Sequence, residues 1–128
     1  MTNVDKVSAA LSEWVFNIAK NLLPHISIPQ NSTIGHFMGI LGVDPTKYSV
    51  WNELGFLAEP IIQTMVTPAV SKMLEGIPED QVPELANKFV DSFISKANEK
   101  GTINLFGIEL GSASFERLKE LINRNMQL

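Results

Sequence analysis

Formal charge is distributed very unevenly along this chain, and this distribution limits how the chain can fold. The fifty-one residues from Asn21 to Ser71 carry four charged side chains, whereas the fifty-seven from Lys72 to Leu128 carry sixteen. Ionised groups avoid protein interiors because removing them from water is costly. We therefore expect the charge-poor stretch to be largely withdrawn from solvent, covered by the rest of the chain, by a second copy, by a partner or by a bilayer.

Length and composition fit a single helical domain covering residues 1–128. The chain is 45% hydrophobic and 19% charged, values typical of globular proteins. Its net charge is −4, and only two of its ten basic residues are Arg. This balance disfavours nucleic acid as a partner without excluding it, since phosphate binding normally needs a basic face. The absence of Cys excludes disulfides and thiolate chemistry.

The N-terminal residues lack the basic-then-apolar pattern of a signal peptide. The longest uncharged stretch, Asn21–Val43, contains two prolines and several polar residues, so it does not resemble a transmembrane helix. We expect a soluble protein that is cytoplasmic or part of a particle assembled inside the cell.

Apolar spacings of three and four residues predict about six helices. Asn3 is the expected cap of the first, Pro24 ends it, and Asp44-Pro45 opens the third. Alternation around Phe106-Gly107 predicts a β-hairpin over 102–110. The expected fold is mainly α, a compact irregular bundle with this small hairpin before the C-terminal helix. The predicted helices cover 4–23, 33–41, 44–54, 56–75, 82–100 and 112–126.

Two structural questions stay open at this point. The helix that begins near Phe56 either bends or breaks at Pro68, where one backbone hydrogen bond is lost. The hairpin either packs on the helices and pairs with residues 26–28, or is completed by a partner's strand.

No residue pattern predicts an enzyme, a cofactor or a metal site. His25 and His36 are eleven residues apart, and neither has a carboxylate or a second His within a helical turn. Nucleophile elbows, phosphate-binding loops and calcium loops are absent. We therefore expect no catalytic residues, no cofactor and no metal. The Gly35–Gly39 spacing inside a short apolar helix would allow another helix to approach closely, or would serve internal packing.

One stretch carries the pattern of a known DNA-binding motif. Leu41-Gly42-Val43 is followed by Asp44-Pro45, then Tyr48-Ser49 and Trp51. This resembles the turn and second helix of the helix-turn-helix in phage-repressor-type regulators. The resemblance implies that Asp44, Pro45, Thr46, Ser49 and Val50 would face the DNA groove. Met38 and Ile34 depart from the family pattern, and Lys47 is the only nearby cation. A small DNA-binding regulator using residues 33–54 is therefore the alternative function.

The leading hypothesis is a non-enzymatic interaction or assembly module. Segment 34–74 is rich in aromatic residues and Met, which are enriched at the centres of protein interfaces. We expect a homo-oligomer or a structural subunit of a larger complex, with protein partners contacting this segment. A peripheral membrane helix over 60–75 is disfavoured, since Lys72 is its only cation. The predicted interface residues are Phe37, Met38, Leu41, Trp51, Phe56, Met65 and Met73.

Overall fold

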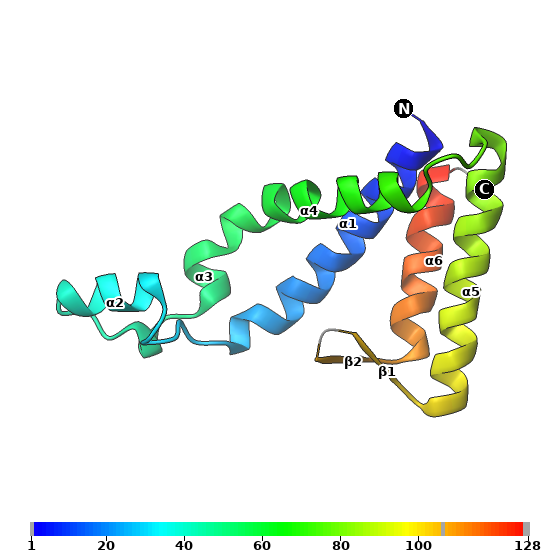
Figure 1. The fold of residues 1–128 in the computed structure, drawn as a ribbon. Coiled ribbons are helices and arrows are strands. Elements are labelled where there is room, and N and C mark those ends of the chain that lie inside the picture. The colour runs from blue at the N-terminus through cyan, green and yellow to red at the C-terminus, as the bar shows by residue number, and fades with distance from the viewer. Residues whose placement is uncertain (1, 106, 127–128) are drawn as a thin grey trace. The chain divides into compact units, whose positions relative to one another are not determined.

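The computed structural model confirms a mainly helical fold with one two-stranded hairpin before the last helix (Figure 1). The structure describes residues 2–105 and 107–126, apart from the side chains of Val50 and Leu54. The six α-helices are α1 (Asn3–Leu22), α2 (Thr33–Ile40), α3 (Val50–Leu54), α4 (Ala58–Met73), α5 (Val82–Lys100) and α6 (Ser112–Met126). Four 3₁₀ turns connect them: η1 (Leu23–His25), η2 (Pro45–Lys47), η3 (Gly55–Leu57) and η4 (Glu79–Gln81).

The chain divides into two compact units. Unit 1 comprises residues 1–14 and 63–128, and unit 2 comprises residues 15–62. The boundaries fall within α1 and α4, so each of these helices contributes to both units. The expectation of a single domain stays a prediction.

The core of unit 1 is built around Phe115 on α6, which is 1% exposed. Its ring stacks on Phe93 of α5, with the ring centroids 5.4 Å apart, and lies 5.7 Å from the Trp14 ring of α1. The Trp14 Nε1–H donates to the Ser114 carbonyl at 2.8 Å. A buried indole normally needs such a partner. Helices α1, α5 and α6 therefore meet at one aromatic cluster.

Polar contacts also link the elements of unit 1. The backbone N–H of Asn3 donates to the Glu79 carboxylate at 3.0 Å, and the Asn3 side-chain amide donates to the Glu79 carbonyl at 2.8 Å. Lys119 on α6 pairs with Asp91 on α5 at 2.6 Å. Asn3 thus hydrogen-bonds to η4 and does not cap α1. The cap is Thr2, whose Oγ1 accepts from the Asp5 N–H while the Asp5 carboxylate accepts from the Thr2 N–H.

The hairpin consists of β1 (Ile103–Leu105) and β2 (Ile108–Leu110), which are antiparallel with Asn104 opposite Glu109. Glu109 accepts hydrogen bonds from the Thr102 hydroxyl and from the Asn104 amide. These bonds hold the pKa of the Glu109 carboxyl below its usual value, the Thr102 bond contributing most.

Unit 2 is organised around a short backbone pairing rather than a large core. The Ile28 N–H donates to the Tyr48 carbonyl at 3.0 Å, and Ser27 bridges to Ser49 in antiparallel fashion. Residues 27 and 28 thus pair with the segment at Tyr48 and Ser49, and their suggested pairing with the hairpin stays a prediction. Ile28 is 3% exposed and is the one large apolar side chain of unit 2 that is buried, among the residues whose side chains are described.

The predicted helix over 44–54 is wrong, because the chain leaves helical geometry at Tyr48 and Ser49. Asp44 caps only the single turn η2, and Tyr48 then adopts an extended conformation with ψ 136°. This conformation allows its carbonyl to accept from Ile28. Ser49 provides a new cap for α3 by accepting from the Asn52 N–H at 3.2 Å.

Other local predictions agree with the structure more closely. Ser32 caps α2 by accepting from the Gly35 N–H, and Gly42 follows the helix with φ 78°. Helix α4 passes through Pro68 without ending, which answers the open question there. Within α5, Lys88 pairs with Glu84 one turn earlier at 3.2 Å. Within α6, Arg117 pairs with Glu120 at 3.1 Å.

Gly35 and Gly39 have different roles. A Cβ at Gly35 would lie 2.0 Å from the Pro29 carbonyl oxygen, whereas a Cβ at Gly39 would meet nothing within 4 Å. The close approach at Gly35 is therefore internal, between the start of α2 and the loop before it.

We predict that Gly35→Ala destabilises unit 2 by about 1–3 kcal/mol, because the clash is with backbone that cannot rotate away. Gly39→Ala is the matched control in the same helix, and it should leave stability unchanged or raise it by about 0.5–1 kcal/mol. Urea unfolding followed by tryptophan fluorescence, to which Trp51 of unit 2 and Trp14 of unit 1 both contribute, measures both. Equal effects of the two substitutions would contradict the packing described for Gly35.

A second prediction concerns the hairpin. Thr102→Val removes the largest cause of the lowered Glu109 pKa, so the pKa should rise toward the usual value for Glu. Carboxyl-detected NMR titration of the two proteins provides the measurement. A wild-type folded pKa below the unfolded value means that this contribution to stability is present at neutral pH and is lost as pH falls through the folded pKa. An unchanged Glu109 pKa in the variant would show that the Thr102 bond is not formed in solution.

Candidate interaction surface

Exposed large apolar side chains are concentrated in the charge-poor segment. Ten of the thirteen such residues among those described lie within 34–74, and the other three are Leu22, Ile26 and Phe89. Within the segment the buried residues, among those whose burial is described, are Gly35, Pro45, Val70 and Leu74. The ten exposed residues are Ile34, Phe37, Ile40, Leu41, Tyr48, Phe56, Leu57, Ile61, Met65 and Met73. We refer to these ten as the apolar surface; the first eight belong to unit 2, whereas Met65 and Met73 belong to unit 1.

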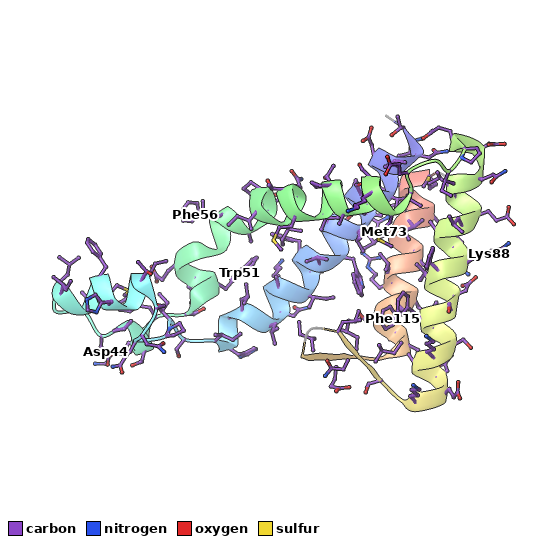
Figure 2. The ribbon with its side chains drawn as sticks, viewed as in Figure 1. Asp44, Trp51, Phe56, Met73, Lys88 and Phe115 are labelled. Atoms are coloured by element: carbon purple, nitrogen blue, oxygen red, sulfur yellow. The ribbon has the colours of Figure 1, made fainter. Side chains whose placement is uncertain are left out.

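Five of the seven predicted interface residues belong to the apolar surface. Their exposed fractions are 62% for Phe37, 65% for Leu41, 78% for Phe56, 70% for Met65 and 67% for Met73. They come from α2 and the residue after it, from η3 and from α4; Figure 2 labels Phe56 and Met73.

The other two predicted residues, Met38 and Trp51, are half-buried. Trp51 contributes to the packing of unit 2. Its ring meets Phe16 of α1 edge to face, with centroids 5.5 Å apart, and it lies over Gly55, where a Cβ would come within 3.1 Å of the indole. An aromatic side chain used in this way supports α3 rather than offering a free contact.

Ile40 is the clearest member of the surface that the prediction of interface residues left out. It is 71% exposed, second only to Phe56 among the large apolar residues described. Helix α2 reads Thr-Ile-Gly-His-Phe-Met-Gly-Ile, so it has apolar residues on several faces and no polar stripe to mark the outside. The exposure of Ile40 could have been predicted from two features of α2 together. The helix is apolar on several faces, and it is too short to bury more than one of them.

The residues that resemble a helix-turn-helix do not form one. Tyr48 and Ser49 are extended, so Pro45 and Thr46 lie in η2, and Val50 begins α3. The second helix of such a motif must be continuous to present its residues to a DNA groove. Asp44, moreover, accepts from both the backbone N–H and the hydroxyl of Thr46, and these bonds, with a smaller contribution from Lys47, lower the pKa of its carboxyl. Asp44 therefore caps the turn η2.

Two further features of the described residues bear on the site. No group of three His, Asp or Glu side chains lies close enough together to hold a metal ion there. In the same part of the chain, no helix is both long enough and apolar enough to cross a bilayer.

Comparisons of this chain with models of protein families, with curated proteins and with solved structures find no match.

We predict that the apolar surface is dispensable for folding of a single copy. Ile40→Gln should change the free energy of unfolding by less than about 0.5 kcal/mol, since its side chain is mostly in water. Phe115→Ala, which empties the centre of the aromatic cluster, should cost about 3–5 kcal/mol. Urea unfolding at high dilution measures both. A large loss of stability for Ile40→Gln under these conditions would show that the side chain is buried within one copy.

Proposed function

We propose that this chain is a non-enzymatic self-assembly module whose copies associate through segment 34–74. The observation that carries the proposal is the excess of exposed over buried apolar side chains in and around unit 2. Among the described side chains of unit 2, Ile28 is the one large apolar residue that is buried, whereas α2, η3 and α4 expose several members of the apolar surface. Large contiguous apolar surface is rare on monomeric soluble proteins and typically marks an interaction site.

The size of unit 2 supports the same conclusion. A stretch of 15–62 is near the length at which chains need disulfides, metals or oligomerisation to be stable. Disulfides are ruled out because the chain has no Cys. Association with another chain would bury apolar side chains that unit 2 leaves exposed, and at about 0.025 kcal/mol per Å² such burial is a substantial gain.

A second copy is the simplest partner for such a surface. Between Tyr48 and Ser71 the formal charges are two carboxylates, Glu53 and Glu59, and α2 carries no Asp, Glu, Lys or Arg. Few like charges therefore oppose the approach of this segment to a second copy. Aromatic residues and Met supply most of the exposed area, as at the centres of known interfaces.

The test is the native mass of the purified protein across a dilution series, measured by sedimentation. We expect a multiple of 14.2 kDa at micromolar concentration that dissociates on dilution. Phe37→Ser, within the apolar surface, should weaken association at least about 10-fold, because exposed aromatics are typical interface anchors. Leu22→Gln is the control, an exposed apolar residue outside the segment.

A wild-type protein that remains at 14.2 kDa throughout the series would contradict self-assembly. Capture of a different protein by that monomer, lost in Phe37→Ser and kept in Leu22→Gln, would replace the second copy with a heterologous partner.

A further inference from the structure

Unit 1 contains an open pocket that is lined entirely by apolar side chains. Its volume is about 160 Å³, and no polar atom contributes to its surface. The walls come from α1, from the end of α4 and from α5 and α6: Val7, Leu11, Val70, Met73, Leu74, Ala86, Phe89, Val90, Phe93, Leu118 and Ile122. An apolar cavity of about 150 Å³ is large enough to take up benzene, so this pocket can hold one aromatic ring.

The mouth of the pocket is exposed apolar surface. Met73 is 67% exposed and Phe89 is 49% exposed, whereas Val70, Val90 and Ile122 in the wall are each at most 4% exposed. A pocket with a buried floor and an exposed rim can receive a side chain that is inserted by another molecule. The absence of polar lining restricts the inserted group to an apolar one.

Phe56 is the side chain of this protein best suited to fill such a pocket. It is 78% exposed, the highest value among the large apolar residues described, and it is an aromatic ring of the size that the cavity holds. Figure 2 shows it on the outer side of the turn between α3 and α4. No ring contact involving Phe56 is present among the described residues.

The charged residues near the two features in sequence differ in sign. The charged residues closest to Phe56 in sequence are Glu53 and Glu59, both exposed. Of the seven charged residues next in sequence to the pocket walls, five are basic; Lys88, Arg117 and Lys119 pair with Glu84, Glu120 and Asp91, so the cations without an ion pair among the described residues are Lys6 and Lys72. Complementary rims of this kind orient partners more than they strengthen binding. The adjoining basic residues are Lys6, Lys72, Lys88, Arg117 and Lys119, and the adjoining acidic residues are Glu75 and Asp91.

We infer that Phe56 of one copy inserts into the apolar pocket of a second copy, with Met73 and Phe89 closing around the ring. This inference rests on the proposed self-assembly and specifies its geometry. The two contacting surfaces are different, so the contact is head-to-tail. Such contacts generate closed rings or open filaments, because a growing assembly keeps a free Phe56 at one end and a free pocket at the other until it closes.

Complementation between two variants tests this geometry directly. Phe56→Ser removes the inserted ring and keeps the pocket, whereas Met73→Glu places a carboxylate at the mouth and keeps the ring. Both residues are mostly exposed, so both variants should fold, which circular dichroism verifies. Each variant alone should associate at least about 30-fold more weakly than wild type, the loss expected for an interface hot spot. An equimolar mixture should form a two-chain species, because one intact ring then meets one intact pocket.

The matched control is Ile26→Ser, which removes a side chain of 40% exposure that lies outside segment 34–74 and does not line the pocket. It should retain wild-type association within about threefold, as residues outside a hot spot do.

The results of these experiments distinguish the insertion of Phe56 from self-assembly by another contact. If the wild type associates but Phe56→Ser associates equally well, or if the mixture of the two variants stays monomeric, the inserted ring is wrong and self-assembly stands. If the wild type is monomeric, both are wrong. In that case, toluene binding detected by NMR in the wild type would assign the pocket to a small apolar ligand. If toluene binds only to Phe56→Ser, the pocket of the wild type is filled by Phe56 of the same copy.

Discussion

Apolar burial in this chain is concentrated on the aromatic cluster of Phe115, Phe93 and Trp14. The ring of Phe115 is almost fully enclosed, and the Trp14 indole is both buried and hydrogen-bonded to α6. These contacts join α1, α5 and α6, and the buried positions of α5 and α6 recur with helical spacing around them. A helix gains most of its stability from such a packed face. Unit 1 therefore has what a small domain needs, a core to which each of its long helices contributes.

Unit 2 is built differently, and its properties follow from the lack of an equivalent cluster. Its elements are short, and each is stabilised locally, by the Ser32, Asp44 and Ser49 caps and by the Ile28–Tyr48 backbone bond. Such bonds contribute about 1 kcal/mol each and do not replace a hydrophobic core. Unit 2 therefore exposes more large apolar side chains than it buries, among those described, in a segment with few charges. This imbalance is the physical basis of the proposed self-assembly.

The sequence predicted the parts of the fold that depend on local periodicity. The apolar stripes of α1, α5 and α6 and the alternation at Ile103 and Ile108 identify their elements without reference to the rest of the chain. The break at Tyr48 could not be predicted in this way, because its cause is a backbone bond to Ile28, twenty residues earlier. Asn3 was likewise a reasonable cap on local grounds, and the contact that removes it from that role comes from Glu79. For the candidate site, composition indicated the segment but not the exposed face, and so Ile40 was left out while the inward-packed Trp51 was included.

The most direct test of this account is amide hydrogen exchange in α2 as a function of protein concentration. Helix α2 is short and largely exposed in a single copy, so its amides should exchange quickly at high dilution. If copies cover one another through this segment, protection of residues 33–41 should rise steeply from nanomolar to high micromolar concentration, while protection of the α5 and α6 core stays constant. Exchange in α2 that is independent of concentration, whether fast or slow, would contradict the central claim that a second copy shields the charge-poor segment.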